Sequence, residues 1–148
     1  MPMEFKSILV PVSGTEADEE AIKLACRLAR ADKAKVLVVY VIPIERTLPL
    51  DTEKTAEVQK AEDILDRMEN VARGQNYVIE TDLLQAREVG PSIINEAIER
   101  ESDLILMGVP YKRPFGQFSL GTVVPHVLKN TPCRVILYHQ YTPPSEDT

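Results

Sequence analysis

The chain has 148 residues, 44% of them hydrophobic and 27% charged, with 17 Lys and Arg against 23 Asp and Glu. This is the composition of one ordinary soluble domain, and a chain of this length buries enough surface to fold without a metal or a disulfide. The formal net charge of -6 disfavours nucleic acid as a partner, because binding to phosphate backbones requires a surplus of basic side chains.

Two further features indicate the compartment. The longest apolar run, Val36 to Ile44, is far shorter than the ~20 residues that span a bilayer, and Met1 to Val12 does not resemble a signal peptide. We therefore expect a cytoplasmic protein without direct membrane insertion. Cys26 and Cys133 stand alone in apolar surroundings, which is typical of core residues.

Apolar runs alternate with helical patterns along the whole chain, an order typical of βαβ units. Runs rich in Val, Ile and Leu predict buried strands over residues 8–12, 36–42, 104–107 and 135–138. Residues 77–84 alternate apolar and polar side chains, which predicts a fifth strand near an edge. The sequence thus predicts the α/β class, with one open five-stranded parallel sheet and helices on both faces.

Apolar residues at helical spacing predict helices over residues 16–31 and 53–73. Gly74 is placed to end the second of these in a left-handed conformation. Pro91 is expected to open a third helix that turns Ile93, Ile94, Ala97 and Ile98 inward, and a fourth helix is expected to start near Gly121. We expect a loop over residues 43–50, a domain that covers residues 1–141 and a disordered tail at 142–148.

Small residues cluster after two predicted strands, where open α/β sheets bind ligands. The first cluster is Pro11, Val12, Ser13, Gly14 and Thr15, which suits either a ligand loop or an ordinary helix cap. The second is Gly108, followed by a twelve-residue loop and by Gly121 and Thr122 at a helix start. Free N–H groups and the positive end of the helix dipole favour phosphate there, and a loop of this length is uncommon unless it is functional or disordered.

The sequence gives weak support for catalysis. It contains neither a dinucleotide fingerprint nor a Walker lysine, and His126 and His139 stand alone. Ser13, Gly14, Thr15 and Asp18 have a faint similarity to the Ser-Gly-Gly-x-Asp loop of ATP pyrophosphatases, but the second glycine is missing.

Residues 6–15, Lys-Ser-Ile-Leu-Val-Pro-Val-Ser-Gly-Thr, resemble the opening of universal stress protein domains, and residues 108–135 resemble their closing motif. The resemblance implies a doubly wound sheet of order 3-2-1-4-5 and a homodimer through Cys133 to His139. Residues 110–113, 116–121 and 127–134 look most like domains associated with amino-acid transporters, which implies an amino-acid transporter or another protein as a partner.

The resemblance also implies a binding site for an adenine nucleotide, ATP or AMP, with magnesium only as the companion of a triphosphate. Adenine would lie near Val41, ribose near Ser13, and phosphates over Gly108, Gly121 and Thr122. The chain departs from the family motif twice, with Tyr111 in place of a glycine and Ser13 in place of an aspartate. The full set of expected nucleotide-binding residues is Pro11, Val12, Ser13, Gly14, Val41, Met107, Gly108, Tyr111, Gly121, Thr122 and Val123.

Three functions remain open from the sequence. The first is a non-catalytic regulatory protein that binds adenine nucleotides through a partly degenerate phosphate loop. The second is a dimeric interaction module of the same fold in which Tyr111 narrows the pocket and nucleotide binding is lost. The third is a weak ATP hydrolase, for which no residue is an obvious general base.

Overall fold

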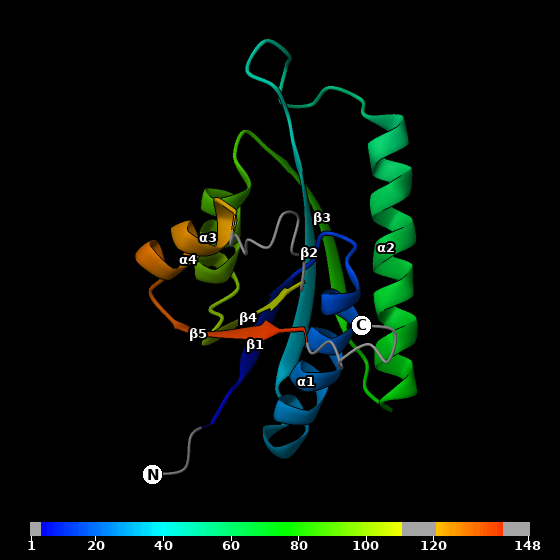
Figure 1. The fold of residues 1–148 in the computed structure, drawn as a ribbon, viewed down its shortest axis with the longest axis vertical. Helices are drawn as coiled ribbons and strands as arrows, with labels where there is room; N and C mark the ends of the chain where they lie inside the picture. The colour runs from blue at the N-terminus through cyan, green and yellow to red at the C-terminus, as the bar shows by residue number, and fades with distance from the viewer. Residues whose placement is uncertain (1–3, 111–120, 141–148) are drawn as a thin grey trace, which may run out of the picture.

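Five parallel strands form one sheet in the order β3-β2-β1-β4-β5, as expected (Figure 1). The computed structural model describes residues 4–110 and 121–140. The strands are β1 (Ser7–Pro11), β2 (Lys35–Pro43), β3 (Glu80–Ala86), β4 (Leu104–Val109) and β5 (Arg134–His139). β2 and β3 are added in turn on one side of β1, and β4 and β5 are added in turn on its other side. β1 therefore lies at the centre, and the expected edge position of the third strand is confirmed.

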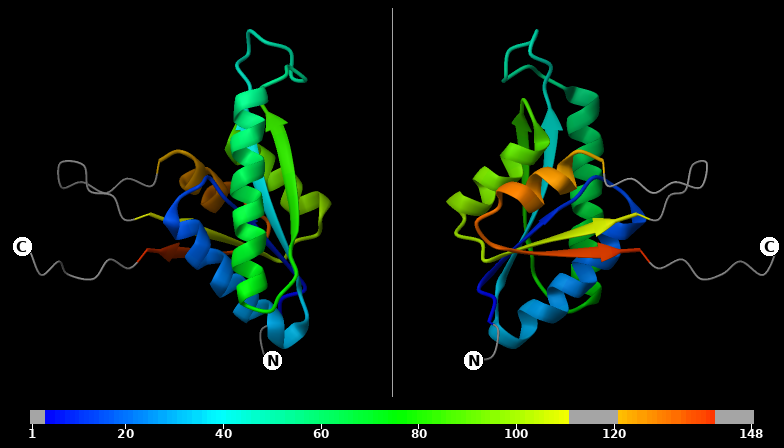
Figure 2. Two further views of the ribbon diagram at one scale, coloured as in Figure 1. Left: turned by 90° about the vertical axis from the view of Figure 1, so that its right-hand side faces the viewer. Right: turned by 60° about the vertical axis from the view of Figure 1, so that its left-hand side comes forward.

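Four helices cover the sheet: α1 (Glu16–Asp32), α2 (Thr55–Gly74), α3 (Val89–Glu99) and α4 (Val123–Asn130). Helices α1 and α2 lie on one face, and α3 and α4 lie on the other (Figures 1 and 2). The central strands are buried on both sides, so successive side chains enter different cores. Ile8 and Val10 pack with α1 and α2, whereas Leu9 packs with α3.

Two expected boundaries around the third strand are wrong. β3 begins at Glu80, where pairing with Leu37 of β2 begins, and Val78 in the preceding segment is 91% exposed. Gly74 does not end α2 in a left-handed conformation, since the helix includes Gly74 and the positive φ of 58° falls on Asn76. Asn tolerates this conformation better than most residues, because its short side chain hydrogen-bonds locally.

The other two helices also differ in detail from the expectation. α3 begins at Val89, so Pro91 is its third residue, in the first turn where a missing N–H breaks no helical bond. Ile98 is 56% exposed and does not face the core, although Ile93, Ile94 and Ala97 do. α4 begins at Val123, two residues after Gly121, near which its start is expected.

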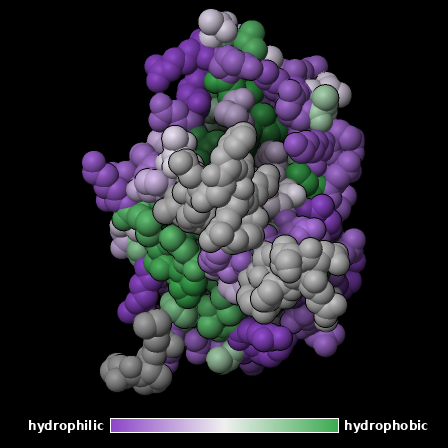
Figure 3. Space-filling view, in the orientation of Figure 1, coloured by the Kyte–Doolittle hydropathy of each residue, from purple (hydrophilic) through white to green (hydrophobic). Residues whose placement is uncertain are grey.

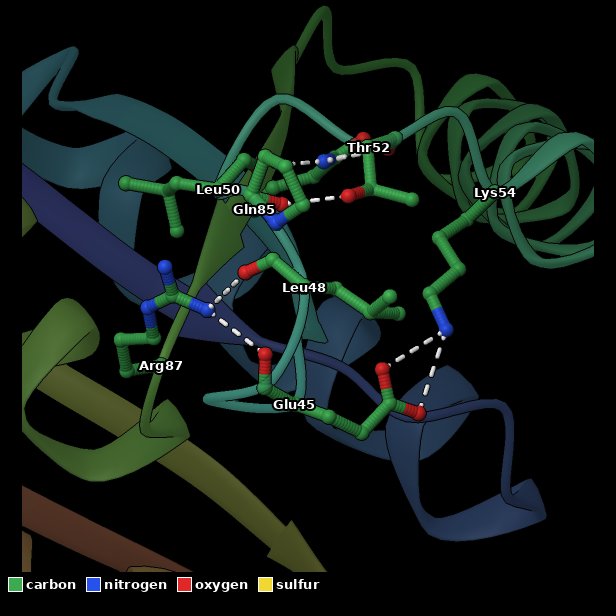
Figure 4. A network of polar contacts seen from close by, with 8 residues as sticks. Glu45, Leu48, Leu50, Thr52, Lys54, Gln85 and Arg87 are labelled. Atoms are coloured by element: carbon green, nitrogen blue, oxygen red, sulfur yellow. Dashed lines mark hydrogen bonds and ion pairs between the residues drawn. The ribbon is translucent and has the colours of Figure 1, made fainter.

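The loop between β2 and α2 is held against the end of β3 by polar contacts (Figure 4). Arg87 donates hydrogen bonds to the carbonyls of Glu45 at 2.6 Å and Leu48 at 2.7 Å. Gln85 donates to two further carbonyls of the loop, and Lys54 pairs with the Glu45 carboxylate at 2.9 Å. These contacts fix the predicted loop without giving it regular secondary structure.

Cys26 is buried, as expected, whereas Cys133 is half-buried at the margin of the core beside α3 and α4. In the described ranges, none of the helices combines the length and apolar character needed to cross a bilayer.

Candidate functional site

β1 and β4 separate towards their carboxyl ends. Their pairing covers Ile8 with Leu104 and Leu9 with Ile105, and extends no further. By contrast, β1 remains paired with β2 as far as Pro11, and β4 remains paired with β5 as far as Val109. The sheet therefore opens between β1 and β4, which is the point where the direction of strand addition reverses and where doubly wound folds bind ligands.

A cavity of about 300 Å³ lies at this opening. Seven of the expected site residues line it: Pro11, Val12, Ser13, Met107, Gly108, Gly121 and Val123. The lining also includes six residues that the sequence analysis did not assign to the site: Asp18, Val89, Ile93, Val109, Pro110 and Val124. The structure thus brings together the ends of β1 and β4 with α3 and the start of α4.

The other expected residues lie elsewhere. Gly14 faces a separate, open groove along α2, and Thr122 lines a neighbouring cavity of about 380 Å³ that also contains His126. Val41 is buried in the core beside α3. Tyr111 lies outside the described residues.

Gly108 is required by packing inside the protein, a reason that the sequence analysis did not anticipate. A Cβ at Gly108 would lie 2.4 Å from the carbonyl oxygen of Ala17 and 2.7 Å from its carbonyl carbon. These are backbone atoms in the first turn of α1, which cannot move away as a flexible side chain can. Gly108 therefore lets α1 approach β4, in addition to lining the cavity.

Asp18 organises the loop between β1 and α1. Its Oδ2 accepts hydrogen bonds from the backbone N–H groups of Ser13 at 3.0 Å, Gly14 at 2.6 Å and Thr15 at 2.8 Å. The loop can turn towards the carboxylate because Gly14 adopts a φ of +101°, a backbone conformation that residues other than glycine rarely adopt. A Thr followed three residues later by an acidic residue is a capping signal, so this pattern could have indicated Asp18 from the sequence.

Burial raises the pKa of Asp18 above its ordinary value, because desolvation penalises the charged carboxylate. The three N–H groups of the loop act in the opposite direction and lower the pKa, and Arg67 adds a smaller favourable charge. Arg67 also donates to the Gly14 carbonyl at 3.3 Å and pairs with Glu19 at 3.2 Å. This contact ties α2 to the loop that borders the cavity.

The start of α4 borders the other side of the cavity. Gly121 has a φ of +68°, and a Cβ there would meet nothing within 4 Å, so this glycine is needed for its backbone conformation and not for space. Val123 and Val124 belong to the first turn of α4, where backbone N–H groups have no acceptor within the helix. Such a turn suits an anion at the mouth of the cavity.

Within residues 4–110 and 121–140, no group of three or more His, Cys, Asp or Glu is arranged to hold a metal ion. The fold and the cavity together define a doubly wound α/β protein with a cavity at the switch point of its sheet, the position at which such folds bind ligands.

The chain belongs to the universal stress protein family, whose model matches residues 4–139. It is similar to universal stress protein MJ0531 of Methanocaldococcus jannaschii, with 27% identity over 139 residues that cover 90% of this chain and 81% of the relative.

Two solved structures share the fold and hold a nucleotide. One is the universal stress protein from Archaeoglobus fulgidus in complex with dAMP, with 21% identity and a TM-score of 0.72, covering 91% of this chain and 98% of that one. The other is a universal stress protein in complex with cAMP, with 18% identity and a TM-score of 0.69, covering 93% and 98%.

Proposed function

We propose that this protein is a non-catalytic regulatory protein that binds an adenine nucleotide in the cavity between β1 and β4. The observation that carries the proposal is the early end of the pairing between these strands, which leaves a largely apolar cavity at the switch point. An apolar lining suits a purine base, because burying its faces removes them from water. The first turn of α4 at the cavity mouth suits the phosphate.

The relatives support the choice of ligand. Two family members of the same fold have been solved with dAMP and with cAMP, both adenine nucleotides. Within the described lining, however, no basic side chain is available to neutralise a triphosphate. We therefore propose that the site favours AMP over ATP.

Calorimetric titration with AMP, cAMP and ATP tests this proposal, together with a variant that blocks the cavity. Ser13 lines the cavity and is exposed, so Ser13→Trp should fill the entrance with little effect on folding. Thr47→Trp is the matched control, because Thr47 is also exposed, lies in the β2–α2 loop and does not line the cavity. We expect AMP binding to be lost in Ser13→Trp and kept in Thr47→Trp. Failure of all three nucleotides to bind the unmodified protein would refute the proposal.

Tyr111 supplies a second test. Its position corresponds to a family glycine, so we propose that the tyrosine weakens ATP binding by narrowing the approach to the phosphate. Tyr111→Gly should then bind ATP more tightly than the unmodified protein does. Unchanged or weaker binding in this variant would show that Tyr111 is no obstruction.

We further propose a homodimer through residues 133–139. β5 is an edge strand, and edge strands pair readily with another chain. Figure 3 shows hydrophobic residues gathered where β5 lies in Figure 1, and Val135, Ile136, Leu137 and Tyr138 are each only partly buried. Light scattering should give the dimer mass, and a monomer mass at micromolar concentration would exclude this interface. A cytoplasmic location and an amino-acid transporter as partner remain proposals that rest on the sequence.

A further inference from the structure

Few polar side chains line the cavity. Among its described lining residues, Ser13 and Asp18 alone carry polar side chains, and Asp18 alone is ionisable. Asp18 is 2% exposed, so water screens its charge poorly. A phosphate inside the cavity would meet this carboxylate with no described cation to offset it. The part of a ligand that lies against Asp18 should therefore donate a hydrogen bond and carry no negative charge.

The two oxygens of Asp18 have different surroundings. All three N–H groups of the loop point to Oδ2, and no hydrogen bond from a described residue reaches Oδ1. An ionised carboxylate can accept about four hydrogen bonds in total, so Oδ1 retains its capacity. Because the bonds to Oδ2 fix the side chain, Oδ1 is already in place before a ligand arrives. Because this acceptor is already ordered, little conformational entropy is lost when a ligand binds to it.

We propose that Asp18 determines the specificity of the cavity by accepting a hydrogen bond from a ribose hydroxyl of the bound nucleotide at Oδ1. This inference rests on the proposed function and adds to it a preference for ribonucleotides over deoxyribonucleotides. The physical reason is the low exposure of the acceptor. A ligand that lacks the hydroxyl displaces water from the carboxylate without replacing its hydrogen bond, and sites with buried polar groups reject such analogues strongly.

The amino group of adenine is the alternative donor to Asp18. It lies on the rim of the flat base, whereas the hydroxyls lie on the sugar that joins the base to the phosphate. A base among the apolar residues of α3 and β4, with its phosphate at the start of α4, places the sugar between these two regions. The loop that carries Ser13 and Asp18 borders the cavity from the end of β1. This arrangement favours the hydroxyl, and the two donors are separable by experiment.

The experiment measures affinities for AMP, 2′-deoxy-AMP, 3′-deoxy-AMP and inosine monophosphate, which keeps both hydroxyls but lacks the amino group. We expect one of the deoxynucleotides to bind about 10- to 100-fold more weakly than AMP, the range for a hydrogen bond to a charged group. Inosine monophosphate should keep most of the affinity. In Asp18→Asn, the amide oxygen takes the place of Oδ2 opposite the three loop N–H groups, so the ligand meets a neutral NH2 donor where it met a charged acceptor. The ratio between AMP and that deoxynucleotide should therefore fall well below its value in the unmodified protein.

Asp103→Asn is the matched control. The Asp103 carboxylate also accepts backbone N–H groups, from Lys6 at 2.8 Å and Ser7 at 3.2 Å, but it lies at the opposite end of β1. Its substitution should leave the ratio unchanged. Because each ratio is measured within one variant, a general loss of affinity cancels. If Asp18→Asn fails to fold, Asp18→Glu, which keeps the charge but moves the acceptor, should also abolish the preference.

The outcomes separate the two proposals. If the unmodified protein binds AMP and both deoxynucleotides equally, Asp18 does not recognise ribose and this inference fails alone. It also fails if the preference in Asp18→Asn is as large as in the unmodified protein, or if only inosine monophosphate loses affinity. If no adenine nucleotide binds at all, the proposed function fails and this inference fails with it.

Discussion

Substitution of Gly108 by alanine tests whether this glycine is needed for packing or for ligand approach. The added Cβ would lie 2.4 Å from the backbone oxygen of Ala17, so either the first turn of α1 or β4 must move. Overpacking of a core costs about 1–3 kcal/mol, and backbone contacts place this case at the upper end. A loss of about 3 kcal/mol corresponds to a fall in Tm of about 6–12 °C for a protein of this size.

Thermal or urea unfolding without any ligand is the appropriate assay, because a role confined to ligand approach would leave unfolding unaffected. Gly74→Ala is the matched control, since a Cβ there meets nothing within 4 Å and the residue lies in α2. Because Gly74 is the last residue of α2, alanine there should gain less than the roughly 0.5–1 kcal/mol that it gains over glycine in the middle of a helix. Equal stability of Gly108→Ala and the unmodified protein would refute the packing argument.

Three further predictions concern other parts of the molecule. Gly121→Ala should lose about 1–2 kcal/mol from the left-handed φ of +68° alone, so a variant as stable as the unmodified protein in urea would contradict this reasoning. Arg87→Ala removes the hydrogen bonds to Glu45 and Leu48, so amide exchange in residues 44–54 should accelerate while the core strands keep their protection. Burial, with a further contribution from Asp82, raises the pKa of Glu96 above its ordinary 4.5, so its contribution to stability is present below pH 4.5 and is lost as the pH rises through the folded pKa. Between pH 4.5 and neutral pH, the free energy of unfolding measured in urea should therefore fall less for Glu96→Gln than for the unmodified protein. Parallel pH dependences of the two proteins would contradict this prediction.

The sequence pattern was sufficient to predict an element where the burial of that element's own side chains determines its structure. β1 and β2 are continuous apolar runs because both faces of these strands are buried, and α1 has an apolar stripe because one of its faces is buried. Burial of this kind can be read directly from the spacing of apolar residues.

The sequence predicts the start of β3 three residues too early, because residues 77–79 belong to the same alternation of apolar and polar side chains. The strand begins where its pairing with β2 begins, at Glu80 opposite Leu37. Tyr77 precedes β3. Its hydroxyl donates a hydrogen bond to the Ala34 carbonyl, and its side chain packs against the core beside α1.

The sequence by itself determined the α/β class, the location of the small-residue clusters after β1 and β4 and, through a family resemblance, the strand order. Only the tertiary structure decided which of these residues share a cavity, because that depends on where β1 and β4 stop pairing and on how α3 approaches them. It also gave Gly108 its packing role, through a helix 91 positions away in the chain. Asp18 carries a local capping signal, but its place in the cavity lining follows from the separation of two strands, which no local pattern encodes.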